Sequence, residues 1–169
     1  MHATPDKRVR IHVDLAGQVL TVLRPGMEPI TFPVSTASKG AGERAGSFQT
    51  PRGEHFIRAC IGSGLPAGAV LVGRRPSGEI YTEEFARQYP ERDWILSRIL
   101  WLCGKQSGFN RLGTVDSMRR YIYIHGTPDS QPMGVPASHG CIRMRNSDVI
   151  DLYAMVEPGT PVTISEGKL

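Results

Sequence analysis

The residues best suited to chemistry lie near the C-terminus, in the segment Ser138-His139-Gly140-Cys141, with His125 sixteen positions before the cysteine. A cysteine thiol attacks a carbonyl carbon as the thiolate, so it needs a base or a positive charge beside it. His125 ends a strand-like run and can supply that base from a rigid position. These residue types therefore predict acyl transfer through a Cys141 nucleophile.

The neighbours of Cys141 strengthen this prediction. Gly140 allows a sharp backbone turn beside the nucleophile. The amides of Gly140 and Cys141, together with the His139 side chain, are candidate hydrogen-bond donors to a developing oxyanion. Arg143 is close in sequence, and a helix is expected a few residues further on. Both features place positive charge near the thiol and are expected to favour the thiolate.

Two other interpretations of the same residues stay open at this level. A single cysteine is usually a small buried apolar group, and a single histidine is usually a hydrogen-bonded structural one. His125, His139 and Cys141 are also candidate zinc ligands, although their spacing matches no common zinc pattern and no fourth ligand lies nearby in sequence. Residue types alone leave the nucleophilic, structural and zinc-binding interpretations open.

The elements that must position these residues are predicted to be mostly strands. The chain has 169 residues, which suits one domain over 1–169, and its 19 glycines and 13 prolines favour short elements joined by turns. Alternating or β-branched runs predict strands at 8–15, 19–23, 30–36, 54–61, 69–72, 120–125 and 161–164.

Some segments carry more specific expectations. Residues 94–102 fit both helical and strand spacing, and we favour a strand. Pro33 places its strand at a sheet edge or a bulge, because proline lacks the amide donor. Helices are predicted at 83–88 and at 147–156, the second with Asn146 as its N-cap.

Composition excludes several classes of function. The net charge is +4, and the basic residues are scattered rather than gathered into a nucleic-acid arm. No run approaches the roughly 20 apolar residues of a membrane span, and the first residues lack the apolar region of a leader. We therefore expect a cytoplasmic protein without membrane insertion, or a periplasmic one if a leader has been removed.

The cysteines do not predict a disulfide framework. There are three, Cys60, Cys103 and Cys141, and they are widely spaced. Reduced thiols fit this pattern best, although a single Cys60–Cys103 bridge stays open.

Two blocks of sequence resemble a known family. His125-Gly126-Thr127, followed at this interval by Ser138-His139-Gly140-Cys141-Ile142-Arg143-Met144-Arg145-Asn146, resembles the signature of the L,D-transpeptidase catalytic domain, also called the YkuD domain. Thr50-Pro51-Arg52-Gly53 resembles that family's Thr-Pro-x-Gly segment. The resemblance covers nearly the whole chain and implies a mostly-β domain, a sandwich or mixed sheet with a flanking C-terminal helix.

The resemblance implies roles for individual residues. Cys141 is the nucleophile, and His125 is its general base, with the imidazole oriented by the Gly126 carbonyl. No metal and no cofactor are implied. His139 and Gly140 are expected to take part in catalysis. Substrate contacts are expected from Ser138 and Arg143, and also from Tyr123, whose place in an alternating strand allows it to face a groove.

The resemblance also implies a substrate, the stem peptide of peptidoglycan or a muropeptide. Family members cleave the bond between the third residue and a terminal D-Ala, leaving a thioester on the cysteine. Attack of water on this thioester gives L,D-carboxypeptidase activity, whereas attack of an amine gives a 3→3 cross-link. We expect a monomeric carboxypeptidase of peptidoglycan recycling, because no leader or wall-binding module is seen. A transpeptidase and a catalytically silent wall-binding domain are the alternatives.

Overall fold

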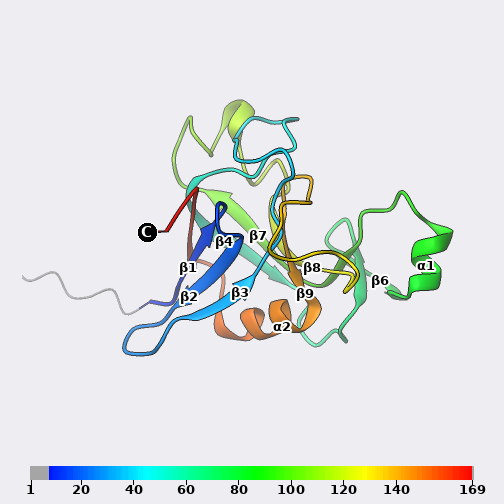
Figure 1. Ribbon diagram of the computed structural model, residues 1–169. Coiled ribbons are helices and arrows are strands. Elements are labelled where there is room, and N and C mark those ends of the chain that lie inside the picture. Colours follow the sequence, from blue (N-terminus) through cyan, green and yellow to red (C-terminus); the bar gives the residue numbers. More distant parts are fainter. Residues whose placement is uncertain (1–7, 169) are drawn as a thin grey trace, which may run out of the picture.

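The computed structural model describes residues 8–168, and their strands form one mixed sheet that curls around a central core (Figure 1). The prediction of a mostly-β fold with a mixed sheet and a C-terminal helix is confirmed. The first seven residues, on which the expectation about a leader rests, lie outside the described part. In chain order the elements are β1 (Arg10–Asp14), β2 (Val19–Leu23), β3 (Ile30–Pro33), β4 (Gly53–Ile61), β5 (Ala69–Val72), β6 (Arg75–Ile80), α1 (Glu83–Gln88), β7 (Ile95–Gly104), a short 3-10 turn (Gly113–Val115), β8 (Tyr123–Thr127), β9 (Ile142–Arg145), α2 (Asn146–Met155) and β10 (Pro161–Ser165).

The sheet is ordered β3-β2-β1-β10-β4-β7-β5-β6, and β8 pairs with both β7 and β9. The pairs β1–β10 and β8–β9 are parallel. Pro33 ends the edge strand β3, as predicted. Just beyond it, the amides of Ser35 and Arg143 each donate to the other's carbonyl at 2.9 Å, which joins this segment to β9. The curl is therefore closed at the strand that follows Cys141.

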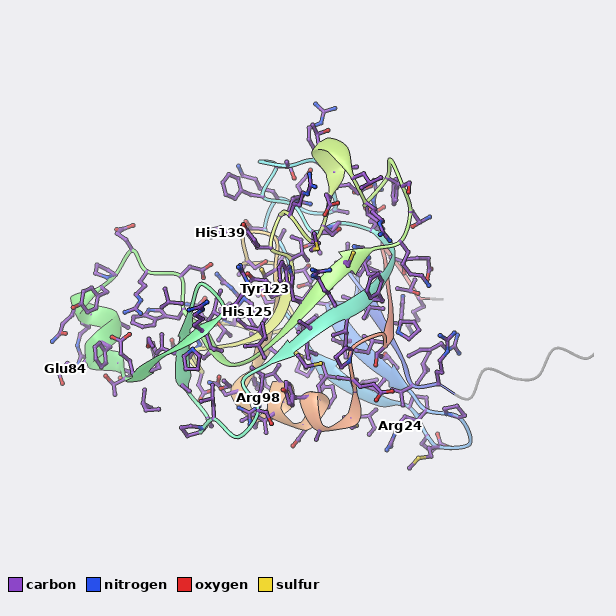
Figure 2. The ribbon with its side chains drawn as sticks, turned by 180° about the vertical axis from the view of Figure 1, so that it is seen from behind. Arg24, Glu84, Arg98, Tyr123, His125 and His139 are labelled. Atoms are coloured by element: carbon purple, nitrogen blue, oxygen red, sulfur yellow. The ribbon has the colours of Figure 1, made fainter. Side chains whose placement is uncertain are left out.

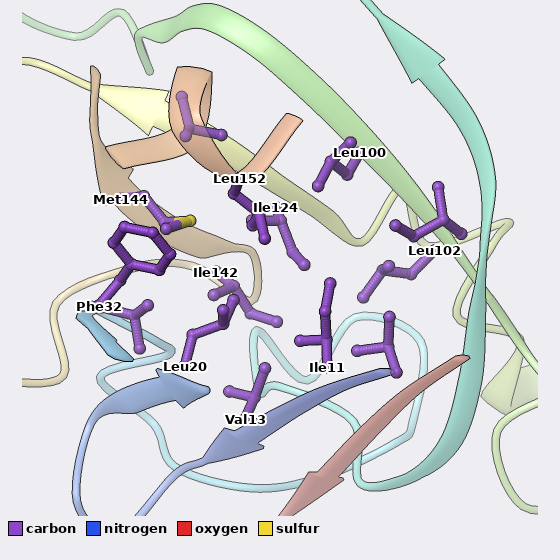
Figure 3. Close-up of a cluster of buried hydrophobic side chains, with 14 of the residues drawn as sticks. Ile11, Val13, Leu20, Phe32, Leu100, Leu102, Ile124, Ile142, Met144 and Leu152 are labelled. Carbon is purple, nitrogen blue, oxygen red and sulfur yellow. The ribbon is translucent and has the colours of Figure 1, made fainter. Parts of the chain in front are cut away.

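The core lies inside the curl, where side chains from β1, β2, β3, β7, β8, β9 and α2 converge (Figure 3). Ile124 of β8 and Ile142 and Met144 of β9 are fully buried there. Burying each such side chain stabilises the fold by about 1.5–3 kcal/mol, which fixes the face that these strands turn inward. Because side chains alternate along a strand, His125 and Arg143 must point to the opposite face.

Several boundaries differ from the predicted ones. The strand predicted at 120–125 begins later and runs to Thr127, because Tyr121 has a left-handed backbone (φ 55°) in a turn before it. Strand β6 was not predicted, since its sequence is polar and exposed. The strand predicted at 30–36 ends at Pro33, where the chain leaves β2 for β9.

The two helices and strand β7 can be compared with the elements predicted at 83–88, 147–156 and 94–102. Helix α1 covers 83–88 as predicted, with the Thr82 hydroxyl accepting from an amide of its first turn. The strand favoured at 94–102 is confirmed as β7. The prediction of Asn146 as an N-cap is wrong, because Arg145 occupies that position and makes no side-chain cap bond. Among residues 8–168, neither helix is long and apolar enough to cross a membrane.

His55 is a buried structural group of β4, as expected. Its ring bonds to the Gly53 carbonyl through Nδ1 at 3.0 Å and to the Ser117 hydroxyl through Nε2 at 2.8 Å. Burial lowers the pKa of His55 from 6.5 to about 4, partly opposed by the bond to Gly53. The imidazole is therefore neutral in the folded protein at neutral pH.

Acidification is expected to destabilise the fold through His55. Between pH 6.5 and 4 the unfolded chain takes up a proton at this residue and the folded chain does not, so the free energy of unfolding falls as the pH falls. The lowered pKa corresponds to about 3 kcal/mol over that range. Urea denaturation at pH 7.5 and pH 4 measures the change, and His55→Gln is expected to remove this part of it. An unchanged pH dependence in the variant would contradict the assignment.

Candidate active site

Cys141 lies directly before β9, half-buried against the start of β8. Its Sγ donates to the Tyr121 carbonyl at 3.3 Å and accepts from the Tyr123 amide at 3.4 Å. The thiol is thus held by backbone groups of the neighbouring strand. This arrangement fixes the position of the sulfur without using any ionised side chain.

His125 occupies the same face of the sheet as Cys141. The parallel register places His125 beside Arg143. Tyr123 and Cys141 each lie two residues earlier in the chain, so alternation points their side chains to the same face as His125 and Arg143. Figure 2 shows Tyr123, His125 and His139 in one region of the molecule. The structure therefore places the predicted nucleophile and base on the same face of the sheet, at neighbouring positions of two paired segments.

The His125 ring is oriented by the Gly126 backbone, as expected from the resemblance. Nδ1 lies 2.6 Å from the Gly126 oxygen and must donate to it, so Nε2 is the nitrogen that can accept a proton. Glycine is required at this position because a Cβ would collide with the Leu96 carbonyl oxygen and with Asn146 Oδ1. Asn146 Nδ2 also donates to the Thr127 carbonyl at 3.0 Å, which holds the end of β8 in place.

The thiol and the imidazole are both neutral at rest. Burial raises the pKa of Cys141 to about 11, and the positive charges of Arg143 and Arg120 only partly oppose this effect. Burial also lowers the pKa of His125 below 6.5, against the effect of its bond to Gly126. At pH 7 the thiol keeps its proton and Nε2 remains a free base.

The expected stabilisation of the thiolate by a helix is wrong, whereas the charge of Arg143 does lower the pKa of Cys141, as expected, but by less than burial raises it. The missed strand β9 puts four residues, roughly 13 Å at about 3.3 Å per residue, between Cys141 and α2. A helix end at that distance has little influence on the sulfur, because its effect falls off within about one turn. Burial then outweighs the remaining charges. The proton must therefore leave the thiol during attack rather than beforehand.

The turn at Gly140 presents one amide for an oxyanion. Gly140 has φ +133°, a conformation that favours glycine, as predicted. Its amide donates to Ser138 Oγ at 3.2 Å and is already engaged, whereas no acceptor within residues 8–168 takes the Cys141 amide. Of the two amides expected to bind the oxyanion, only that of Cys141 is available.

Ser138 and Tyr123 were expected to contact substrate, and the structure gives both positioning contacts. Ser138 is 1% exposed, and its hydroxyl donates to the Cys141 carbonyl at 2.6 Å while accepting from Gly140. Tyr123 is 5% exposed, and its amide holds the Cys141 sulfur. Both residues hold the nucleophile in place, and their contacts with substrate stay a prediction.

Arg143 and His139 lie on either side of Cys141 and differ in environment. The Arg143 guanidinium is almost buried and bonds to the Asp93 carboxylate and to the Ala137 carbonyl, each at 3.3 Å. It therefore ties two loops to β9, and its contact with substrate stays a prediction. His139 is exposed, with its ring edge-on to Phe48 at 6.3 Å. A pocket of about 220 Å³ lies beside these residues and is lined by both His139 and Arg143.

Two further residues support the nucleophile and were not assigned to the site from the sequence. Arg120 donates to the Gln49 carbonyl at 2.6 Å and to the Glu43 carbonyl at 3.1 Å, which braces the loop over the site and brings a positive charge near Cys141. Paired arginines are typical of exposed surfaces, so no signal marked it. Thr50 is fully buried, and its hydroxyl donates to the Gly140 carbonyl at 2.8 Å. The Thr-Pro-x-Gly block was the signal for Thr50.

The buried Thr50 hydroxyl is expected to be needed for turnover. It also accepts from the Ala37 amide at 3.0 Å, so Thr50→Val leaves two buried backbone groups unsatisfied. We expect a loss of about 1–3 kcal/mol of unfolding free energy for each group and a fall in kcat of about tenfold to a hundredfold, because the Gly140 turn shifts. Denaturation and turnover measure these effects. Thr50→Ser keeps the hydroxyl and should restore activity, while a fully active Thr50→Val protein would contradict the role.

The remaining site expectations concern cysteines and metals. Cys60, Cys103 and Cys141 are all free thiols, so the Cys60–Cys103 bridge left open by the sequence is not formed. Within residues 8–168, no three His, Cys, Asp or Glu side chains are grouped as a metal site. The zinc-binding interpretation of His125, His139 and Cys141 therefore has no ligand cluster in the described structure.

Comparison with known proteins identifies the family. Residues 8–164 match the model of the L,D-transpeptidase catalytic domain, YkuD. The protein YkuD of Bacillus subtilis is 47% identical over 47 residues, which cover 28% of this chain and 29% of that protein. YqjB of Bacillus subtilis is 39% identical over 59 residues, covering 35% of this chain and 32% of that protein. The matched segments thus span about a third of these relatives.

Solved L,D-transpeptidases share the fold. The structure from Xylanimonas cellulosilytica aligns with a TM-score of 0.54 and 19% identity, covering 98% of this chain and 65% of that one. That from Mycobacterium smegmatis aligns with a TM-score of 0.53 and 17% identity, covering 94% of this chain and 58% of that one. The family model spans nearly all of the residues that form the sheet, the nucleophile turn and its histidine, and the chain therefore belongs to the L,D-transpeptidase catalytic-domain (YkuD) family.

Proposed function

We propose that this protein cleaves the peptide bond before the terminal D-Ala of peptidoglycan stem tetrapeptides, through a thioester on Cys141 that water resolves. The observation that carries the proposal is the placement of Cys141 and His125 on one face of the sheet, with the imidazole oriented by Gly126 and the Cys141 amide free. Membership of the L,D-transpeptidase family supports the choice of substrate.

The chemical steps follow from this geometry. As the sulfur attacks the scissile carbonyl carbon, the thiol proton passes to His125 Nε2, and the oxyanion accepts from the Cys141 amide. The intermediate collapses with cleavage of the C–N bond, and His125 returns the proton to the departing amine of D-Ala. Water then attacks the thioester and gives a proton to His125. Cleavage of the C–S bond releases the carboxylic acid product, and the sulfur regains its proton from His125.

A small pocket lined by His139 and Arg143 supports a small acceptor such as water, although neither Cys141 nor His125 is among its lining residues. Its volume of about 220 Å³ is below the roughly 300 Å³ at which pockets for drug-sized ligands begin. An amino acid and a few water molecules fit in such a space, whereas a second stem peptide extends beyond it. Its lining includes the polar side chains of Thr127 and Asp93, which suit a small zwitterion such as D-Ala.

Incubation with a disaccharide-tetrapeptide tests the proposal. We expect equimolar disaccharide-tripeptide and free D-Ala by liquid chromatography and mass spectrometry, with no dimers. Abundant 3→3 dimers would overturn the assignment of water while leaving the thioester intact. Absence of both products would overturn the proposed function. A substrate that ends in D-Ala-D-Ala serves as the control, since its terminal D,D bond should survive.

A further inference from the structure

A group of cationic and aromatic side chains adjoins Cys141 and takes no part in the steps above. We call it the cationic–aromatic platform, and its members are Arg58, Arg74, Trp101, Tyr121 and the Tyr123 hydroxyl. The side chains come from β4, from the β5–β6 turn, from β7 and from the segment entering β8. Residues distant in sequence thus gather at one place.

The platform lies on the same sheet face as the nucleophile. Trp101 of β7 pairs with Tyr123 of β8, and the Tyr123 amide bonds to the Cys141 sulfur. Neighbouring strands lie about 4.8 Å apart, so the Trp101 backbone is about 10 Å from that of Cys141 across the sheet. Extended peptide covers roughly 3.3 Å per residue, so this span corresponds to about three residues of bound substrate.

Arg74 is held at the centre of the platform. Its guanidinium carbon lies 4.7 Å from the Trp101 ring centroid and 5.0 Å from that of Tyr121, and Nη1 donates to the Tyr123 hydroxyl at 3.0 Å. The Arg58 guanidinium lies 5.4 Å from the same indole. Stacking on aromatic faces orients a guanidinium and leaves its edge for a planar anion.

The backbone at the platform is strained. Arg74 has φ +64° and Tyr121 has φ +55°, left-handed conformations that side chains with a Cβ rarely adopt. Such conformations destabilise the folded state by about 1–3 kcal/mol each and are found mostly at functional sites. The strain places the Arg74 and Tyr121 side chains in contact with each other.

In the part of the chain that the structure describes, the cations of the platform have no acidic partner. Within residues 8–168, no carboxylate lies within ion-pair distance of Arg58 or Arg74, although Arg52, Arg92 and Arg143 all have one. The Tyr121 side chain is 53% exposed, so the platform is open to a ligand. Two oriented guanidinium groups without a counter-ion favour a carboxylate ligand.

We propose that the cationic–aromatic platform binds a carboxylate of the acyl donor, two to three residues on the N-terminal side of the scissile bond, with Arg74 as the main contact. The inference rests on the proposed function, because it names how the stem peptide is recognised. It makes the enzyme selective for stem peptides whose second residue carries a free carboxylate over those in which that group is amidated.

Calorimetric binding to protein carrying Cys141→Ala tests this selectivity without turnover. We expect the free-acid tetrapeptide to bind about tenfold to a hundredfold more tightly than the amidated one, the range of a charge-assisted hydrogen bond. Adding Arg74→Gln should remove that preference, while Arg75→Gln, an exposed neighbour, should keep it. Equal binding of both peptides, or a preference unchanged by Arg74→Gln, would overturn the platform. Tight binding of the disaccharide alone would also overturn it, in favour of a sugar site.

Turnover with intact Cys141 separates this inference from the proposed function. Arg74→Gln is expected to raise KM for the free-acid peptide with kcat little changed, because the contact is equal in ground and transition states. If the unmodified enzyme leaves the tetrapeptide uncleaved, the proposed function fails. If it cleaves both peptides equally well, the function stands and the platform fails.

Discussion

Replacing Cys141 with alanine is expected to reduce release of D-Ala from the tetrapeptide by a factor on the order of 10⁶, to the background of the assay. The substitution removes the only atom that forms the covalent intermediate, and neither the free Cys141 amide nor His125 can form a thioester. The half-buried thiol contributes little packing, so the fold should persist. Circular dichroism and turnover together measure both expectations.

Cys60→Ala provides the matched control. Cys60 is also half-buried and lies on β4, and burial raises its pKa as it does for Cys141. It packs against the main hydrophobic core, whereas Tyr123 and Cys141 belong to a separate cluster. We expect this variant to keep full activity. Substantial turnover by Cys141→Ala would exclude Cys141 as the nucleophile, while loss of turnover in Cys60→Ala would show that removing another half-buried thiol is enough to impair the enzyme.

The second large effect is expected for His125→Gln, which should lower kcat/KM at pH 7 by about 10²–10⁴-fold. Glutamine keeps a polar side chain at the Gly126 carbonyl but has no basic nitrogen to accept the thiol proton. The thiol of Cys141, with a pKa of about 11, then has to ionise to solvent before it attacks. The loss follows from the neutral resting state of the pair.

The pH profile distinguishes this role from a structural one. In the unmodified enzyme, kcat/KM should rise with pH through the lowered pKa of His125, below 6.5, and level off once the imidazole is neutral. In His125→Gln that rise should disappear, and kcat/KM should instead climb about tenfold per pH unit towards pH 11, as thiolate forms. A variant that is slow but keeps the profile of the unmodified enzyme would contradict the role of a base.

Much of the fold followed from local pattern. Buried strands such as β1 and β8 alternate apolar and polar side chains or carry β-branched runs, and the pattern directly reflects burial of one face. Strand β9 was missed because its four residues overlap the catalytic motif, and Arg143 and Arg145 interrupt its apolar positions. It is a strand because Ser35 and β8 supply hydrogen bonds from distant parts of the chain, which no local pattern records.

The same limit applies to the site. Cys141 and His125 were identified from the sequence because a thiol and an imidazole are reactive groups and because the residues around them follow the order of a known motif. The resting ionisation of the pair could not be predicted from the sequence, since burial depends on packing around Tyr123 that sequence spacing does not give. The contacts of Arg74 with Trp101 likewise depend on a hairpin folding back over β7. The sequence shows which residue types are present, but only the tertiary structure shows which of them come into contact.

The central claim, a thioester on Cys141, is tested most directly by intact-protein mass spectrometry after acid quenching of a reaction with excess tetrapeptide. We predict an adduct equal to the tetrapeptide minus alanine, mapped by proteolysis to the fragment containing Cys141 and absent from Cys141→Ala. Release of D-Ala with no such adduct at any quench time, together with undiminished release by Cys141→Ala, would contradict the account.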